Sequence, residues 1–203
     1  MNGANQTMKQ LLTFLSLLLL IQLQDVSAAA AEDTIRDTSQ KVLQRLDNER
    51  NKLKLNPEYL QVLVRELIIP QFDFHKMSRL VLGKRWHKLD NRSQTCFSQG
   101  FSNVLMERYA DILLSYDNQT ITYEPAKPLD GKGYVSVRQT ISRAGANPLP
   151  VDYPMQAEGN DWKVIDIIVD GASLVRNYRG IYQYEINRRG LDKFIQSFPE
   201  CAR

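Results

Sequence analysis

Apolar and polar side chains alternate through the stretch that decides the fold, which reads GYVSVRQTISRAGANPLPVDYPMQAEGNDWKVIDIIV (residues 133–169). Val135, Val137 and Ile141 fall on one face of an extended chain, because successive side chains of a strand point to opposite sides. Residues 151–158 alternate in the same way, and the loop between the two segments holds a glycine, an asparagine and two prolines. Since short turns join antiparallel strands, the stretch predicts an antiparallel sheet.

Four strands are expected in this sheet. The first begins at Thr120 and ends at Pro125 and Pro128, and a tight turn at residues 159–161 separates the last two. Pro154 has no backbone N–H to share with a neighbour, so it predicts that the third strand lies at an edge. The predicted strands cover residues 120–123, 133–142, 151–158 and 162–169.

Helical periodicity precedes and follows the strands, because apolar residues recur there at intervals of three and four. Pro57 suits a first helical turn, Asp90 or Asn91 can cap a later helix, and Gly83 and Gly190 can end helices. The predicted helices cover residues 35–53, 57–70, 72–82, 91–116, 174–189 and 191–198. This order predicts an α+β fold, with helices packed on one face of a four-stranded, curved antiparallel sheet.

The N-terminal segment is typical of a cleavable secretory signal peptide. Lys9 precedes an apolar run at residues 11–21, which is shorter than the ~20 apolar residues of a membrane span. Small residues follow, and they offer cleavage sites between Ala29 and Glu32. An uncleaved anchor is the alternative, although polar residues cut the apolar run short. The predicted organisation is a signal peptide, residues 1–31, and a single domain, residues 32–203.

Charge and cysteine content narrow the possible partners and the compartment. The formal net charge of +3 is mildly basic and falls well short of a nucleic-acid-binding protein. No cysteine lies near the cleavage region, so a lipidated N-terminus is not expected. Cys96 and Cys201 permit one disulfide in an oxidising compartment, and two free thiols are the alternative.

Catalytic and metal-binding patterns are missing from the sequence. His75 and His87 have no metal-ligand spacing, and His75 is predicted to be a partly buried structural residue of an apolar helix. Ser173 lacks the G-x-S-x-G context of a nucleophile and suits a helix N-cap. Asp166 and Asp170 could do acid/base work, but no third group near them in sequence supports it. The prediction is therefore no enzyme, no catalytic residue and no metal, with an exported enzyme as an alternative.

Apolar side chains are abundant in both the helices and the sheet. The predicted helix at residues 72–82 is apolar on most sides. A tightly packed core is the simpler interpretation of the composition. The alternative is an apolar cavity between the helices and the sheet, open at one rim. A two-chain phospholipid would need such a cavity, because each buried CH₂ contributes ~0.8 kcal/mol.

Basic residues gather in two segments that are far apart in the chain. A solvated surface is the expected role for most of them, and a rim for a lipid phosphate or docking sites for acidic partners are the alternatives. The two clusters are Lys84, Arg85, Lys88 and Arg92, and then Arg176, Arg179, Arg188, Arg189 and Lys193.

Several motifs follow one another along the chain and carry a resemblance to a known family. The most specific is VDGASLVRNYR (residues 169–179). The others are NPEYL (56–60), LIIP (67–70), LVLGKRW (80–86), the phenylalanines at 97 and 101 running to Tyr109, WKVIDI (162–167) and GLD (190–192). Together they resemble the MlaC family, also called the toluene-tolerance family, of periplasmic phospholipid-binding proteins from Gram-negative bacteria. The cysteine pair and Ala172 depart from the family's pattern.

The resemblance implies a carrier that moves phospholipid between the two membranes of the cell envelope and maintains outer-membrane lipid asymmetry. The implied location is the periplasm, and the cargo is a phospholipid without any cofactor. The implied partners are an outer-membrane lipoprotein–porin complex and an inner-membrane ABC transporter complex with its lipid-binding ring, and no nucleic acid. A carrier of another lipid, such as an isoprenoid, is an alternative.

The lipid tails are then expected to contact a set of apolar and aromatic residues from the helices and the sheet. A bilayer-soluble tail needs side chains of this kind around it. The predicted lipid-binding residues are Met77, Val81, Leu82, Leu105, Tyr109, Val137, Val164, Ile165, Ile167 and Tyr178.

Overall fold

The computed structural model describes the backbone of residues 3–202 and the side chains of residues 28–202 except Pro57. The predicted signal peptide, residues 1–31, thus lies almost entirely outside the residues whose side chains are described. The helices are α1 (Gly3–Leu55), α2 (Pro57–Leu63), α3 (Phe74–Leu82), α4 (Asn91–Tyr109), α5 (Leu174–Arg189) and α6 (Leu191–Ile195). Short helical turns are η1 (Val64–Ile68), η2 (Ile69–Gln71), η3 (Gly83–Lys88), η4 (Ala110–Ser115) and η5 (Pro199–Cys201).

Side-chain caps set the starts of several helices. Asn56 Oδ1 accepts a hydrogen bond from the N–H of Tyr59 at 3.1 Å, and Asp90 Oδ1 accepts one from Ser93 at 2.8 Å. Ser173 Oγ accepts from the N–H of Arg176 at 3.0 Å, so its predicted role as an N-cap is confirmed.

The segment between α2 and α3 is more broken than the predicted helix that ran to Pro70. The chain passes from α2 into a π-helical turn, η1, and then into a 3-10 turn that contains Pro70. Asp73 Oδ1 accepts from the N–H of Lys76 at 2.8 Å, so α3 begins at Phe74 and not at Phe72. A proline has no N–H to continue the α-helical ladder, which accounts for the interruption.

The sheet has six strands, and the prediction of four was wrong. The strands are β1 (Thr120–Pro128), β2 (Tyr134–Ser142), β3 (Leu149–Glu158), β4 (Asp161–Val164), β5 (Ile168–Val169) and β6 (Ala172–Ser173). The hydrogen-bonded order is β1-β2-β3-β5-β6, with β4 also paired to β3, and all these pairs are antiparallel. β1 continues through Pro125 because its register with β2 shifts between Glu124 and Lys127.

The predicted strand at residues 162–169 is divided in two at Asp166, whose carboxylate accepts hydrogen bonds from Ile167, Ser173 and Val175. Its Oδ1 accepts hydrogen bonds from the N–H of Ile167 and of Val175, and its Oδ2 accepts from Ser173 Oγ at 2.5 Å. These bonds tie the middle of the segment to the start of α5. The strand ladder therefore stops at Val164 and resumes at Ile168.

Pro154 lies in the middle of the sheet, so the prediction of an edge strand was wrong. β3 pairs with β2 along one side and with β4 and β5 along the other. The carbonyl of Pro154 accepts from the N–H of Ile165 at 2.8 Å, on the side where β4 and β5 are separated. In an antiparallel strand the N and C=O of a residue face the same neighbour. The nitrogen of Pro154 therefore faces the gap between two partner strands and needs no donor.

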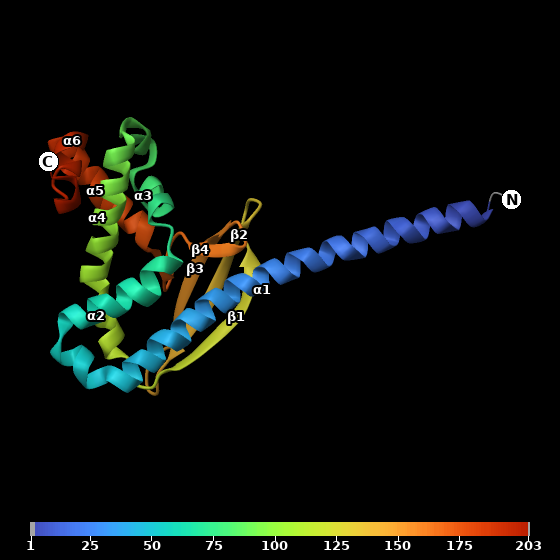
Figure 1. Ribbon diagram of the computed structural model, residues 1–203, viewed down its shortest axis with the longest axis horizontal. Coiled ribbons are helices and arrows are strands. Elements are labelled where there is room, and N and C mark those ends of the chain that lie inside the picture. The colour runs from blue at the N-terminus through green and yellow to red at the C-terminus, as the bar shows by residue number, and fades with distance from the viewer. Residues whose placement is uncertain (1–2, 203) are drawn as a thin grey trace.

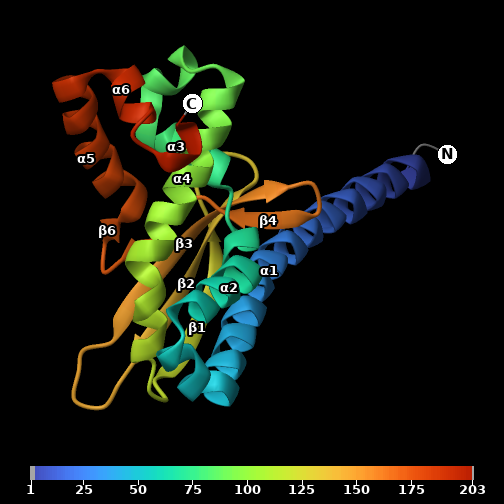
Figure 2. The same ribbon diagram turned by 60° about the vertical axis from the view of Figure 1, so that its left-hand side comes forward.

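The helices form two groups around the sheet. α1 crosses the sheet, while α3, α4, α5 and α6 pack together at its end (Figure 1). Figure 2 shows α4 running from this group down to the level of α2. Ala31 and Ile35 of α1 are buried, and they pack with Val137 and Trp162 of the sheet.

A cluster of rings, which we call the aromatic core, fills the space between α4, α5 and the C-terminal segment. Neighbouring ring centroids lie between 5.0 and 6.1 Å apart. Cys96 and Cys201 form a disulfide beside it, with their Cα atoms 5.1 Å apart. A Cβ at Gly100 would lie 2.7 Å from the ring of Phe198, so the C-terminal segment sits directly on α4. The aromatic core consists of Phe97, Phe101, Tyr178, Tyr182, Phe194 and Phe198.

Candidate functional site

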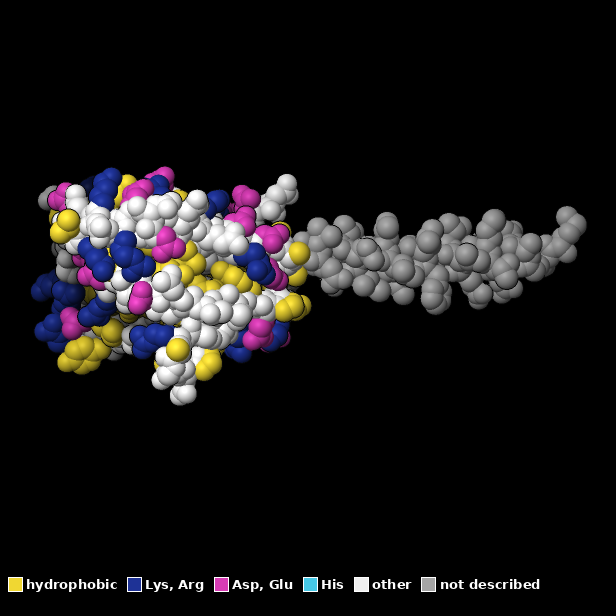
Figure 3. Space-filling model, turned by 90° about the horizontal axis from the view of Figure 1, so that it is seen from below, with side chains coloured by type: hydrophobic (Ala, Val, Ile, Leu, Met, Phe, Trp, Pro, Cys, Tyr) yellow, Lys and Arg dark blue, Asp and Glu magenta, His cyan; other side chains and the backbone are white. Residues whose placement is uncertain are grey.

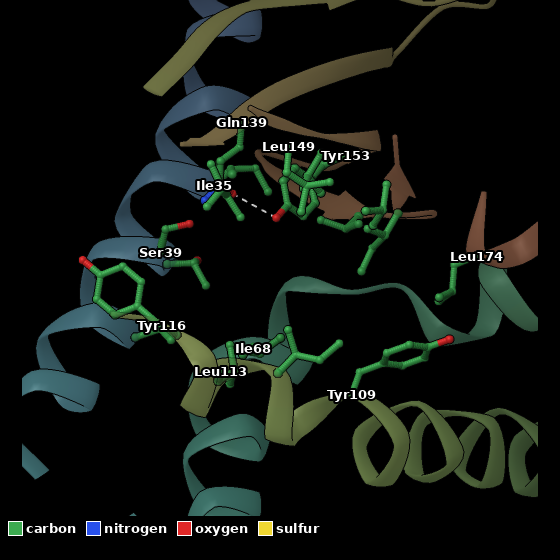
Figure 4. Close-up of a pocket in the computed structure, with 18 of the residues that line it drawn as sticks. Ile35, Ser39, Ile68, Tyr109, Leu113, Tyr116, Gln139, Leu149, Tyr153 and Leu174 are labelled. Atoms are coloured by element: carbon green, nitrogen blue, oxygen red, sulfur yellow. Dashed lines mark hydrogen bonds between the residues drawn. The ribbon is translucent and has the colours of Figure 1, made fainter. Parts of the chain in front are cut away.

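A large cavity lies between the helices and the sheet, with a volume of about 980 Å³. This volume is at the upper end of the ~300–1,000 Å³ typical of ligand pockets. Figure 4 shows Ile35 and Ser39 of α1, Ile68 and Leu113 of the helical turns and Leu149 of β3 around the same space. Long stretches of chain thus converge on one apolar cavity.

The sheet forms one wall through the inward faces of β2 and β3. Ile141 pairs with Leu149, and Gln139 pairs with Val151, in the antiparallel register. All four side chains line the cavity. Because residues two apart in a strand share a face, the alternation in the sequence places an apolar row along this wall.

One polar pair interrupts this apolar wall. Gln139 is only 4% exposed, and its Oε1 accepts a hydrogen bond from Tyr153 Oη at 2.9 Å (dashed line, Figure 4). Burial raises the pKa of Tyr153 well above its ordinary value, so its hydroxyl stays protonated as the donor. The pair can thus be buried without an unpaired amide oxygen.

The helical wall is built from residues one turn apart. Ile35, Ser39 and Val42 lie on the same face of α1 and all line the cavity. Leu105 and Tyr109 contribute from the last turns of α4. The pocket face of these helices carries no charged residue among the described lining positions.

The mouth of the cavity carries exposed apolar side chains. Ile112 is 60% exposed, Leu149 is 39% exposed and Val169 is 38% exposed, and all three line the cavity. The view from below in Figure 3 shows hydrophobic side chains in a furrow between polar and charged ones. Apolar groups at the opening are typical of a ligand-binding groove and leave a path for an apolar ligand to enter.

The predicted lipid-binding residues divide into two sets. Leu105, Tyr109, Val164 and Ile167 line the cavity. The other six are buried or packed elsewhere and are not among its lining residues, and their contact with a lipid stays a prediction. Within this second set, Met77, Val81, Leu82 and Tyr178 belong to the cluster around the aromatic core, and the remaining two are Val137 and Ile165.

Several lining residues were not predicted from the sequence. Ser39 and Val42 of α1 line the cavity, whereas the periodicity of residues 35–53 predicts a helix and does not indicate a surface that faces a ligand. Gln139 had a signal of its own, because it is a polar residue between Val137 and Ile141 on an otherwise apolar strand face. Such a break in alternation marks a polar group that needs a partner or a ligand.

The groups considered for catalysis have structural roles or lie apart. Both oxygens of the Asp166 carboxylate accept hydrogen bonds from the start of α5. His75 is exposed and rests edge-on against Trp86 at 4.8 Å, so the prediction that it is partly buried was wrong. Among the residues with described side chains, no group of three or more His, Cys, Asp or Glu is placed to hold a metal ion. In that same part of the chain, no helix is long and apolar enough to span a bilayer.

Fold and cavity together define a protein with an apolar cavity, suited to an apolar ligand, between a curved sheet and a layer of helices. The family model described as MlaC protein matches residues 36–200. The chain therefore belongs to the MlaC family, and the resemblance in the sequence motifs is confirmed.

Two relatives of known name support this membership. The toluene tolerance protein ttg2D of Pseudomonas putida is 29% identical over 187 residues, which cover 91% of this chain and 86% of the relative. The intermembrane phospholipid transport system binding protein MlaC of Haemophilus influenzae is 24% identical over 200 residues, covering 95% of this chain and 91% of the relative.

A solved structure with a ligand shares the fold. The phospholipid-binding protein from Ralstonia solanacearum, determined in complex with a phospholipid, superposes with a TM-score of 0.75 at 27% identity. The match covers 84% of this chain and 96% of that one.

Proposed function

We propose that this protein is a non-enzymatic phospholipid carrier whose cavity holds the acyl tails. The observation that carries the proposal is the apolar cavity of about 980 Å³ between α1, α4 and the sheet. The related protein from Ralstonia solanacearum binds a phospholipid within the same fold. We include Leu105, Tyr109, Val164 and Ile167 among the residues that contact the tails.

The energetics favour exchange rather than permanent capture. Two acyl chains of about fifteen methylenes each would cost on the order of 24 kcal/mol to expose to water. A bilayer and the cavity both remove that cost, so the net change between them is small. The barrier is the passage through water, and a carrier lowers it by keeping the tails enclosed.

Transport between two membranes is the proposed cellular role, with the periplasm as the location. The proposed partners are a lipoprotein–porin complex at the outer membrane and an ABC transporter complex with its lipid-binding ring at the inner membrane. Maintenance of outer-membrane lipid asymmetry would be the outcome. The Haemophilus influenzae relative is the binding protein of an intermembrane phospholipid transport system, which supports this role.

A surface for such partners is suggested by the two basic clusters. Arg85 Nη2 donates to Asn187 Oδ1 at 2.6 Å, which ties η3 to α5. A Cβ at Gly83 would lie 3.0 Å from Arg179 Nη2. The fold thus brings the basic residues around Lys84 beside those of α5, and a joint basic surface favours acidic partners.

Export by a signal peptide remains part of the proposal, and the burial of Ala31 narrows the expected position of the cleavage site. Ala31 is fully buried and packs with Ile35 against the sheet. A cut on the N-terminal side of Ala31 would keep this contact in the mature protein. The intact mass of the exported protein tests this position.

Lipid extraction tests the proposed function directly. The purified protein is extracted with organic solvent, and the extract is examined by mass spectrometry. Co-purified phospholipid is expected in repeated preparations. Isoprenoids in its place would point to a carrier of another lipid, and an extract without any lipid would refute the proposal.

A further inference from the structure

Arg143 is the one charged side chain among the described residues that line the cavity. It lies directly after β2, in the loop that leads to β3. Neutral polar groups share this part of the lining, among them Asn147 and Gln119. A single permanent charge on an otherwise neutral and mainly apolar surface calls for an explanation in terms of the ligand.

The register of the hairpin places Arg143 at the end of the inward row of β2. Val137, Gln139 and Ile141 occupy this row, and each successive position lies nearer the loop. Ile141 pairs with Leu149, so continuation of the register sets Arg143 opposite Asn147. The row therefore runs from the fully buried Val137 to an exposed cation at the opening.

The backbone of Arg143 is held, while its side chain is available. Its carbonyl accepts a hydrogen bond from the N–H of Ala146 at 3.2 Å. Gly145 in the same turn has a φ of 77°, a conformation that glycine adopts without strain. The turn thus fixes the backbone of Arg143 at the rim of the cavity, and the side chain extends from that point.

Arg138 on the same strand provides the contrast. Its side chain is on the opposite face, and it forms two hydrogen bonds to the Asp152 carboxylate at 2.6 and 2.8 Å. None of the ion pairs found among the described residues includes Arg143. Its guanidinium, with five N–H donors that match phosphate geometry, is left for a ligand.

We propose that Arg143 binds the phosphate of the lipid at the mouth of the cavity. The inference rests on the proposed carrier function, because it takes the tails to lie inside. In a phospholipid the glycerol joins the tails to the phosphate within a few bonds. When the tails fill the cavity, the phosphate therefore lies at the opening, where a bidentate contact with Arg143 can form.

A competition between two lipids tests this assignment. The purified protein is incubated with mixed micelles that contain phosphatidylglycerol and diacylglycerol with the same acyl chains, and the bound lipids are extracted and quantified. Wild type is expected to prefer phosphatidylglycerol. Arg143→Gln is expected to reduce this preference roughly tenfold, since a hydrogen-bonded charge is lost. Arg143→Lys keeps the positive charge but loses the bidentate hydrogen bonding of the guanidinium, so it should retain part of the preference for phosphatidylglycerol.

Matched controls separate the possible failures. Arg79→Gln removes an exposed arginine of α3 that is outside the cavity lining, and it should behave as wild type. An unchanged preference in Arg143→Gln, with both lipids still bound, overturns the inference and leaves the carrier function standing. Wild type that binds neither lipid overturns the carrier function itself.

Inorganic phosphate separates a lipid site from a free-anion site. Added alone, it is expected to give no binding signal by calorimetry, because the tails supply most of the affinity. Binding of inorganic phosphate by wild type that Arg143→Gln abolishes would show a site for the free anion and overturn the lipid assignment.

Discussion

The aromatic core lies between helices and the cavity lies between helices and the sheet; both are apolar, but only the first is filled by side chains. Phe97 is fully buried, and its ring centroid lies 5.1 Å from that of Phe198. Around the cavity, Ile112 and Leu149 stay partly exposed. Rigid rings that contact one another close the first space, while aliphatic side chains on separated layers leave the second open. The contrast indicates that one end of the molecule maintains the fold and the other holds a ligand.

The largest expected effect comes from a truncation in the aromatic core. Phe97→Ala should lower the free energy of unfolding by about 3–5 kcal/mol, because a fully buried ring is removed from a packed cluster. Leu113→Ala in the cavity wall is the matched control and should cost less than about 2 kcal/mol. Urea unfolding of the delipidated proteins measures both, and equal losses would contradict the contrast.

Removal of the disulfide is expected to weaken the same end of the molecule. Cys96→Ser with Cys201→Ser should lower stability by about 2–5 kcal/mol, because the bond closes a loop with a sequence separation of 105 residues. Lipid content per folded molecule should stay the same. Loss of lipid at temperatures where the variant is still folded would mean that the two regions are coupled.

A larger side chain in the cavity should have the opposite profile. Ile141→Trp occupies part of the space, so lipid occupancy should fall severalfold while stability changes by less than about 1.5 kcal/mol. Ile181→Trp, at a 43% exposed position on α5, is the control. Mass spectrometry of extracted lipid gives the occupancy. Full occupancy in Ile141→Trp would place the tails elsewhere.

A smaller loss of stability than in the aromatic core is expected at the polar pair in the sheet wall. Tyr153→Phe leaves Gln139 Oε1 without its donor and should cost about 1–3 kcal/mol. Gln139→Leu combined with Tyr153→Phe should restore part of this loss, because both polar partners are then gone. Single variants and the double variant are compared by urea unfolding, and additive losses would show that the pair does not interact.

The same tyrosine should make stability depend on alkaline pH. Its pKa is raised in the folded protein by burial, so the folded state favours the protonated hydroxyl. This contribution is complete below the unfolded pKa of about 10 and declines as the pH rises above it. Tyr153→Phe should therefore show a shallower loss of stability above that pH than wild type. Parallel curves for the two proteins would argue against a buried, shifted Tyr153.

Local patterns in the sequence were sufficient for most elements of the fold. Alternation in residues 133–142 predicted β2, and Ser173 predicted the start of α5. These features depend on neighbours in the chain. The break at Asp166 depends on tertiary hydrogen bonds to α5, and no local pattern reports such bonds.

The candidate site was harder to predict from the sequence. Periodicity shows that one face of a helix or strand is apolar, but it does not show whether that face meets another element or a cavity. Leu105 and Tyr178 are both apolar or aromatic positions on helix stripes. One lines the cavity, and the other meets the ring of Phe101 at 5.2 Å. Whether a space is filled depends on how several elements pack together, and this information is not local.

Finally, the disulfide has a consequence for the order in which the protein matures. Cys201 comes 105 positions after Cys96, so the bond cannot close until the sheet and α5 have been synthesised. The two sheet strands that wall the cavity, β2 and β3, precede that point in the chain. In an oxidising compartment, the walls that receive the cargo can therefore assemble first, and oxidation of the last cysteine completes the molecule.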